Sequence, residues 1–149
     1  MKKSLLFVAI AILLGTQLHA QILTPVKWSY GFKKISKGEA VIFMKATIEE
    51  GWHLYSQTLK EGGPIKTTFT FPASKSYALV GKTIEPTPIT RNEKVFSMDV
   101  SFFEHSVVFQ QKIKLKTGQA TVKGTVEYMT CNDKQCLPPE TIEFSVAVK

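Results

Sequence analysis

Apolar and polar side chains alternate with a period of two residues over most of the chain after residue 26. In residues 142–148, IEFSVAV, the four large apolar side chains lie at every second position, and residues 41–48 and 107–115 alternate in the same manner. Alternation of this kind marks a β-strand with one buried face. Since no segment keeps a helical repeat of 3.6 residues, the chain is predicted to be all-β with little helix.

Turn-forming residues separate the segments that are predicted to be strands. These segments are residues 27–34, 41–48, 52–57, 66–71, 76–80, 96–103, 107–115, 121–130 and 142–148. Residues 85–90, which contain Pro86 and Pro88, are predicted to form a surface loop. Eight or nine short strands at this spacing indicate an antiparallel β-sandwich of the immunoglobulin-like type.

The first twenty residues have the layout of a secretory signal peptide. Lys2 and Lys3 precede the apolar run Leu5–Leu14, and Ala20 supplies a small residue at the predicted cleavage point. An apolar run of this length is too short to span a bilayer. We therefore expect residues 1–20 to be removed on export and residues 21–149 to form one domain, with an uncleaved N-terminal anchor as the alternative.

The charge of the chain argues against a nucleic-acid partner. Removing Lys2 and Lys3 lowers the count of Lys and Arg from 19 to 17 and leaves 12 Asp and Glu, so residues 21–149 carry +5. The lysines are spaced as on solvated strand faces, so we expect a dispersed charge that serves solubility, with a weak attraction to anionic membrane surfaces. No later segment has the roughly 20 apolar residues that a membrane helix needs.

Cys131 and Cys136 are the two cysteines of the chain, and in an exported protein they are expected to form a disulfide. A bridge that closes about six residues contributes only about 2 kcal/mol to stability, against about 4.7 kcal/mol for a loop of 100 residues. A domain of this size folds without that increment. The loop size weakens a purely structural role, but the spacing alone leaves a structural bridge and a reactive one open.

The residues between the cysteines bear on their reactivity. Lys134 stabilises a thiolate, Asp133 offsets part of that field, and no helix N-terminus is predicted at either sulfur. Such a pair initiates exchange poorly, but its disulfide is a good target for the activated thiolate of a partner. The sequence thus favours a shuttle that is reduced by one protein and oxidised by another.

A metal site is a weaker alternative. Cys131, Cys136, His53 and His105 offer the soft and imidazole ligands that zinc and copper prefer. The four residues between the cysteines do not match the usual spacing of zinc sites. We therefore expect neither a metal nor a cofactor.

The residues around the cysteines resemble those of a known family. Residues 126–131, VEYMTC, and 136–141, CLPPET, are similar to the active-site hairpin of the N-terminal domain of the bacterial thiol:disulfide interchange protein DsbD. Residues 51–55, GWHLY, are similar to the aromatic strand of that family. The resemblance covers roughly residues 25–148, about one domain. It implies an immunoglobulin-like sandwich in the periplasm that takes electrons from a membrane-embedded reductant through a thioredoxin-like carrier and passes them to periplasmic oxidoreductases.

The same resemblance assigns roles to individual residues. It implies that Cys131 and Cys136 are the redox pair and that Cys136 forms the mixed disulfides. It also implies that Phe96 lies over the disulfide as a cap, although Met98 stands where the family has a glycine. A phenylalanine in a predicted strand is equally consistent with the core.

Three further residues are candidates for the lining of the site. His53 and Tyr55 share one face of the predicted strand 52–57 and either line the cysteine pair or form a half-buried aromatic edge. Glu140 either accepts a proton near the cysteines or satisfies the turn that follows two prolines. The residues alone leave both pairs of interpretations open.

The chain departs from the family pattern in two ways. The spacer between the cysteines is one residue shorter than in well-known members, and the chain ends at Lys149 with neither a membrane bundle nor a thioredoxin-like domain. We therefore expect a membrane electron carrier and thioredoxin-like redox proteins to act in trans, without the effective concentration that a tether supplies. The predicted function is that of a periplasmic protein-disulfide reductase component. The alternative is a non-catalytic immunoglobulin-like binding module with a structural disulfide.

Overall fold

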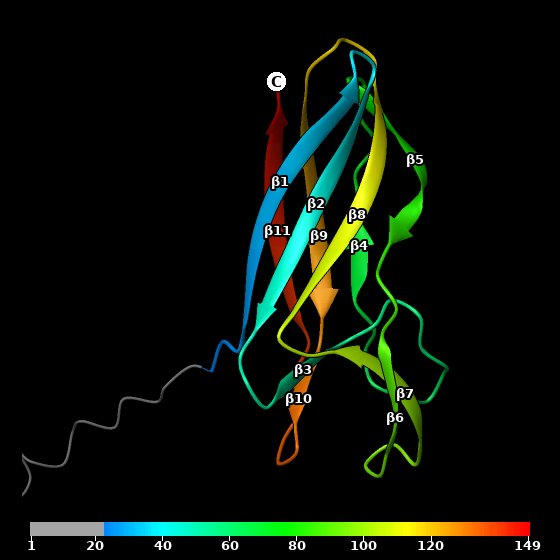
Figure 1. The fold of residues 1–149 in the computed structure, drawn as a ribbon, viewed down its shortest axis with the longest axis vertical. Coiled ribbons are helices and arrows are strands. Elements are labelled where there is room, and N and C mark those ends of the chain that lie inside the picture. The colour runs from blue at the N-terminus through cyan, green and yellow to red at the C-terminus, as the bar shows by residue number, and fades with distance from the viewer. Residues whose placement is uncertain (1–22) are drawn as a thin grey trace, which may run out of the picture.

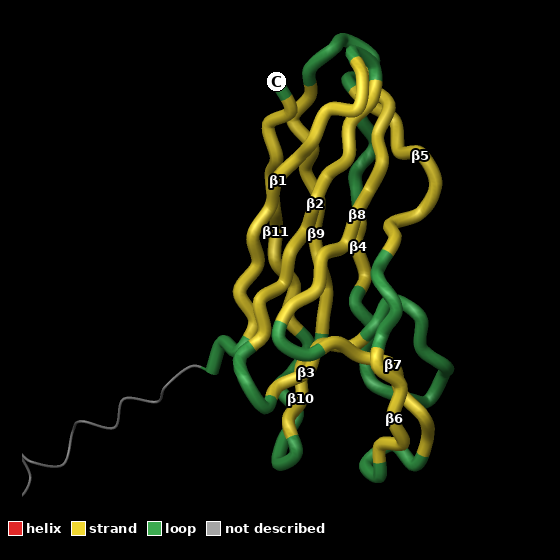
Figure 2. The backbone as a smooth tube through the Cα atoms, viewed as in Figure 1, coloured by secondary structure: helices red, strands yellow, loops and turns green. Residues whose placement is uncertain are grey.

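The alternating segments form strands in residues 23–149, the part of the chain that the computed structural model describes (Figure 1). The predicted signal peptide, residues 1–20, lies outside these residues. The strands are β1 (Val26–Ser36), β2 (Glu39–Ile48), β3 (Trp52–Tyr55), β4 (Thr68–Thr70), β5 (Tyr77–Ile84), β6 (Ile89–Glu93), β7 (Met98–Phe103), β8 (Ser106–Leu115), β9 (Ala120–Tyr128), β10 (Thr130–Asn132) and β11 (Glu140–Val148). Figure 2 shows strands joined by loops and no helix over residues 23–149. In this part of the chain, accordingly, no helix has the length and hydropathy that crossing a membrane requires.

Two sheets pack face to face as the sandwich. One has the strand order β1-β2-β8-β5 and the other β11-β9-β4, and their neighbouring strands are antiparallel. Between them lies the main core, where Ile42, Met44 and Phe109 of the first sheet pack with Val122 and Val126 of the second, all fully buried. Each such side chain contributes about 1.5–3 kcal/mol on burial, and slipping one strand by a residue would turn its whole set to solvent. The predicted all-β, immunoglobulin-like sandwich is confirmed.

A small third sheet extends the sandwich at one end. Its strand order is β10-β3-β7-β6, and Figure 1 shows it at the end of the long axis opposite the β1–β2 turn. A second apolar cluster lies here, in which Tyr55, Val100, Phe102 and Cys131 are buried. The third sheet thus places the cysteine pair at one end of the molecule.

The hairpin of β6 and β7 differs from the prediction. Residues 89–93 form β6, whereas a loop was predicted up to residue 90, and the predicted strand 96–103 begins only at Met98. β6 is an edge strand that is mostly exposed, so it lacks the alternation of a half-buried strand. The residues between the two strands form a turn, in which the N–H of Phe96 donates to the carbonyl of Glu93 at 3.1 Å. Phe96 therefore lies on a hairpin tip rather than in a strand.

The predicted strand 121–130 is divided at Met129. β9 ends at Tyr128, paired with β11, whereas β10 begins at Thr130 and pairs with β3. Both Tyr128 and Thr130 are buried, so the composition remains strand-like across the break. The division moves Cys131 out of the sandwich and into the small sheet.

Candidate functional site

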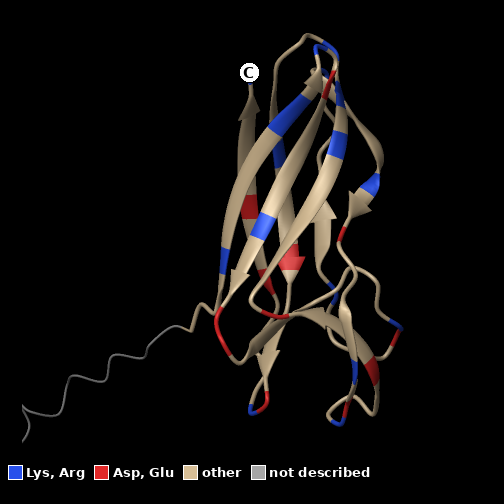
Figure 3. Cartoon of the chain, in the orientation of Figure 1, with Lys and Arg blue, Asp and Glu red and all other residues tan. Residues whose placement is uncertain are grey.

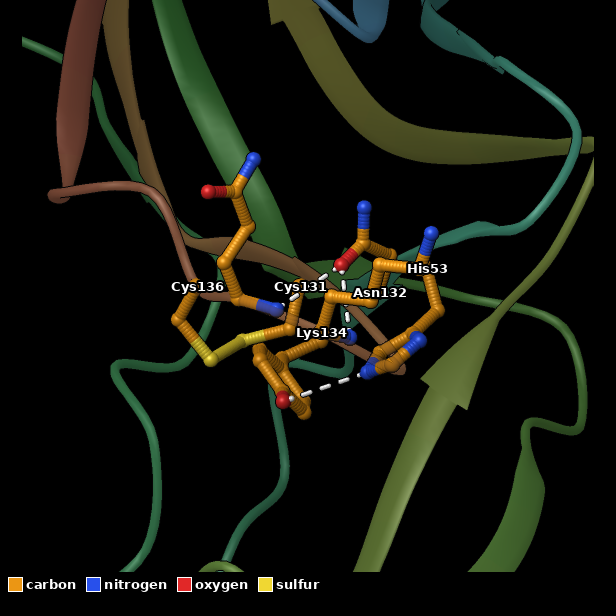
Figure 4. The surroundings of a disulfide bond; sticks show 7 residues. His53, Cys131, Asn132, Lys134 and Cys136 are labelled. Carbon is orange, nitrogen blue, oxygen red and sulfur yellow. Dashed lines mark hydrogen bonds between the residues drawn. A yellow bond between two sulfur atoms is a disulfide. The ribbon is translucent and has the colours of Figure 1, made fainter.

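The two cysteines face each other across a tight hairpin. Cys131 is in β10, and the chain turns back through residues 132–135 so that Cys136 pairs with Cys131 in an isolated antiparallel bridge. Their sulfur atoms are bonded, and their Cα atoms are 4.0 Å apart (Figure 4). The disulfide expected from the sequence is therefore present.

Asn132 shapes the turn between the cysteines. Its Oδ1 accepts hydrogen bonds from the backbone N–H groups of Lys134 and Gln135, both at 2.9 Å, and its own N–H donates to the carbonyl of Gln135 (Figure 4). These bonds form an Asx-type turn that depends on the asparagine rather than on the sulfurs. Asn132 was not among the predicted site residues, although an asparagine that opens a four-residue loop is the signal for such a turn.

The two cysteines differ in their exposure to solvent. Cys131 is 2% exposed and packs against Tyr55, Val100 and Phe102. Cys136 is exposed. Because a thiolate must approach a disulfide sulfur directly in an exchange reaction, the exposure of Cys136 makes it the more accessible side of this bond.

Strand β3 forms the wall beside Cys131. The strand register places His53 opposite Cys131, and Figure 4 shows its side chain beside the hairpin. His53 Nε2 and the Tyr55 hydroxyl lie 3.2 Å apart in a buried hydrogen bond whose donor depends on the histidine tautomer. The ring of His53 also packs against Phe102, with centroids 4.7 Å apart. The structure therefore brings both β3 candidates to the cysteine pair.

Burial shifts the pKa values of His53 and Tyr55, the two titratable side chains of this wall. Desolvation lowers the pKa of His53, with a smaller contribution from Arg91, while Glu93, Glu104 and Asp133 act in the opposite direction. Burial also raises the pKa of Tyr55 to about 12, with a further contribution from Glu93. Both groups are therefore uncharged near neutral pH, and the site holds a neutral imidazole–phenol pair next to the buried sulfur.

Acid is expected to destabilise the fold through His53. Because burial lowers the pKa of His53 from its ordinary value of 6.5, the unfolded chain takes up a proton more readily than the folded one. The stability linked to this group is complete above about pH 6.5 and is lost as the pH falls toward the folded-state pKa. His53→Gln, which does not titrate, is expected to flatten the fall in unfolding free energy below about pH 6.5 in urea titrations. An equally steep fall in the variant would contradict a buried, neutral His53.

The β6–β7 turn carries Phe96 to the edge of the site. Its ring is perpendicular to that of Tyr55, with centroids 6.2 Å apart, and it is partly buried against the cluster that contains Cys131. The neighbouring Val95 is 80% exposed and is not among the residues that pack against this cluster. Phe96 therefore packs onto the wall of the cysteine site, although it is not part of the main core.

Arg91 in β6 contacts two residues, at the end of β7 and just after it, that lie beside the site. Its Nη2 donates to Glu104 Oε1 at 3.0 Å, and its guanidinium carbon lies 4.8 Å from the ring centroid of Phe102. An exposed ion pair contributes little, but the contact with the ring contributes about 0.5–1 kcal/mol. Sequence reasoning missed Arg91, because its role depends on the pairing of β6 with β7, which no pattern in β6 indicated.

Glu140 lies on the return strand. It begins β11, where it pairs with Tyr128, and its carboxylate accepts a hydrogen bond of 2.6 Å from the hydroxyl of that tyrosine. Burial, followed by this carboxylate, raises the pKa of Tyr128. Because Tyr128 belongs to the main core, the observed contact of Glu140 links the start of β11 to the neighbouring β9 within the second sheet. His105 lies in the β7–β8 turn, and within residues 23–149 no group of three or more His, Cys, Asp or Glu is arranged to hold a metal ion.

A family model matches nearly the whole of the described chain. The model is that of the N-terminal domain of the thiol:disulfide interchange protein DsbD, and it matches residues 20–147. The match includes the cysteine hairpin, β3 and the β6–β7 turn. A comparison with curated protein sequences finds no match.

Three solved structures of bacterial domains superpose on this chain. The N-terminal periplasmic domain of ScsB from Proteus mirabilis superposes with a TM-score of 0.57 at 18% identity, over 85% of this chain and 49% of that one, so the chain spans about half its length. The reduced N-terminal domain of Neisseria meningitidis DsbD gives 0.54 at 14% identity, over 85% and 90%. The same type of domain, in a complex with the N-terminal domain of PilB from Neisseria meningitidis, gives 0.55 at 13% identity, over 84% and 87%. At these identities the similarity establishes the sandwich fold.

Proposed function

Because the chain belongs to the family of the DsbD N-terminal domain, we propose that it is a thiol–disulfide exchange module of the periplasm. In this proposal the Cys131–Cys136 pair takes electrons from a membrane-linked, thioredoxin-like reductant and passes them to periplasmic oxidoreductases. The observation that carries the proposal is the pairing of an exposed Cys136 with a buried Cys131 in a six-residue hairpin. A bridge of this size stabilises a fold only slightly, but its outer sulfur is open to attack.

Reduction of the module proceeds in two exchange steps. A thiolate of the reduced partner attacks the sulfur of Cys136, the disulfide bond breaks, and Cys131 leaves as a thiolate that takes up a proton. The second thiolate of the partner then attacks the partner's own sulfur in the mixed disulfide and displaces Cys136. The partner becomes a disulfide and the module a dithiol, so two electrons and two protons have moved.

Oxidation of the module reverses this sequence with a different protein. The thiolate of Cys136 attacks the disulfide of an oxidised partner, and Cys131 then attacks Cys136 to release that partner as a dithiol. In both directions Cys136 carries the intermolecular bond, and Cys131 opens or closes the intramolecular one. The neutral His53–Tyr55 pair lies across the strand from Cys131, where we infer that it stabilises the displaced sulfur as it changes its protonation.

The relatives support the assignment of compartment and partner class. The Proteus mirabilis structure is described as an N-terminal periplasmic domain, and a Neisseria meningitidis DsbD N-terminal domain forms a complex with the N-terminal domain of PilB. We infer that this chain likewise acts in the periplasm and receives a redox protein at its cysteine end. The shape of that end is suited to docking, because both the cysteine hairpin and the β6–β7 hairpin project from it (Figure 1).

Electron transfer to the module is tested by incubating the oxidised protein with a reduced thioredoxin-like protein and then labelling free thiols with a maleimide. We expect both cysteines of the chain to become labelled while the added protein loses an equal number of thiols. A structural disulfide in a binding module would behave differently. It would remain unlabelled after this incubation, and its chemical reduction with a phosphine would lower the thermal midpoint without any gain of exchange activity.

A further inference from the structure

Lysine residues gather at the end of the sandwich opposite the third sheet, where Figure 3 colours several segments of the backbone blue. They come from the end of β1, the β1–β2 turn, the end of β8 and the segment before β5. These seven lysines are Lys33, Lys34, Lys37, Lys75, Lys112, Lys114 and Lys116. Backbone hydrogen bonds tie these segments together, because the N–H of Leu115 donates to Gly38 at 2.8 Å and that of Lys116 donates to Ser76 at 2.9 Å. We call this surface, together with Glu39, the basic end.

The positive charge of the chain is concentrated at the basic end. Six of its lysines are exposed, and the seventh, Lys112, is partly exposed and forms an ion pair of 3.1 Å with Glu39. Seven lysines and one glutamate give +6, whereas residues 21–149 as a whole carry +5, so the rest of those residues carries −1. The spacing along the sequence predicted a dispersed charge, but the pairing of β1, β2, β8 and β5 brings distant lysines to one end.

Exposed apolar side chains accompany these lysines. The register of β1 with β2 shifts between Lys34 and Ser36, and the intervening Ile35 is 55% exposed. Phe32, on the same strand, is 38% exposed. A bulge at a strand end turns a side chain away from the ladder, so the basic end presents an isoleucine that is flanked by ammonium groups.

We propose that the basic end docks on the surface of a membrane that contains anionic lipids. A cluster of four to eight lysines is attracted to such a surface, and an accompanying apolar side chain enters the boundary between headgroups and acyl chains. The exposed isoleucine and phenylalanine favour a lipid surface over a nucleic acid, which gains nothing from Ile35. Docked in this way, the molecule directs its disulfide away from the bilayer, by about 35 Å along the eleven residues of β1, and leaves the cysteine end open to partners.

Vesicle co-sedimentation of residues 21–149, the predicted mature chain, tests this proposal. The vesicles contain phosphatidylglycerol in phosphatidylcholine, and phosphatidylcholine alone serves as the neutral control. One triple variant, Lys33→Gln, Lys34→Gln and Lys37→Gln, removes three charges from the basic end. The matched variant, Lys27→Gln, Lys60→Gln and Lys66→Gln, removes three exposed charges from the remainder of the molecule.

We expect the protein to bind the anionic vesicles and to be released by high salt. Each lysine near an anionic surface multiplies affinity by about fivefold, so the basic-end variant is expected to bind roughly 100-fold more weakly, while the matched variant binds nearly as the parent does. Ile35→Ser is expected to weaken binding several-fold without changing net charge. Equal losses in the two triple variants, no binding to anionic vesicles, or tighter binding to a soluble polyanion such as heparin than to the vesicles would each overturn the proposal.

Discussion

Cys136→Ser is expected to abolish electron transfer between this protein and its redox partners. The substitution removes the exposed sulfur, and the remaining Cys131 is 2% exposed and packed against Tyr55 and Phe102. The variant then has no disulfide for a partner thiolate to reduce, and its buried Cys131 thiol is poorly placed to attack the disulfide of an oxidised partner, so exchange falls to the uncatalysed background. The loss is measured by maleimide labelling of the added reduced thioredoxin-like protein, which should keep its thiols with the variant and lose them with the oxidised parent.

Cys131→Ser is the matched variant, and its expected behaviour is the opposite. Cys136 remains exposed and still forms a mixed disulfide, but the sulfur that would resolve the bond is gone. The variant is therefore expected to accumulate covalent complexes with partners, visible as bands on a non-reducing gel that disappear on reduction. If both variants trap partners equally, or if neither does, the division of roles between the two cysteines is wrong.

Neither variant is expected to unfold. The bridge closes a short loop and contributes about 2 kcal/mol in the chain-entropy account. The turn also keeps the hydrogen bonds of Asn132 to Lys134 and Gln135. Both variants should therefore stay folded, with thermal midpoints several degrees below that of the oxidised parent. Cys131→Ser should be the less stable of the two, because it leaves a hydroxyl at a buried position.

Phe96→Ala is expected to expose the disulfide to small thiols. The ring of Phe96 packs perpendicular to Tyr55, on the cluster that contains Cys131. Because Cys136 is exposed with Phe96 in place, the ring hinders small thiols only from the side of Cys131. Loss of a contact that contributes about 0.5–1.5 kcal/mol therefore raises access to the disulfide by at most about tenfold. The rate of reduction by glutathione, followed by loss of the disulfide under pseudo-first-order conditions, is expected to rise by the same factor.

The neighbouring residue offers a control for the cap. Val95 lies on the same turn but is 80% exposed, so Val95→Ala is expected to leave the rate of reduction by glutathione unchanged. If Phe96 acted only as a core side chain, its loss would instead lower the free energy of unfolding by about 3 kcal/mol or more and leave the folded protein's reduction rate unaltered. The comparison of rate and stability in the two variants separates these roles.

The sandwich could be predicted because each of its strands carries its own signal. β2, β8 and β11 alternate buried and exposed positions over most of their length, and this alternation is local information. The disulfide was equally predictable, because two cysteines in an exported chain with a short loop between them leave few alternatives, whereas the turn that Asn132 forms was not predicted.

The parts that escaped prediction depend on pairing between segments that are distant in the sequence. β6 is an exposed edge strand, so it has no buried face to produce a pattern. Buried residues lie on both sides of Met129, where β9 ends and β10 begins. Only the change of pairing partner, from β11 to β3, distinguishes the two strands. The concentration of lysines at the basic end arises because β1, β2, β8 and β5 are aligned side by side, which spacing along the chain does not reveal.

The reduction potential of the Cys131–Cys136 pair tests the central claim most directly. It is measured by equilibrating the protein with glutathione redox buffers, or with a thioredoxin couple of known potential, and quantifying the free thiols. A module that passes electrons between proteins must lie within the range of its partners, so we predict a value above about −300 mV. A value below about −300 mV would mark a structural disulfide and contradict the proposed exchange function.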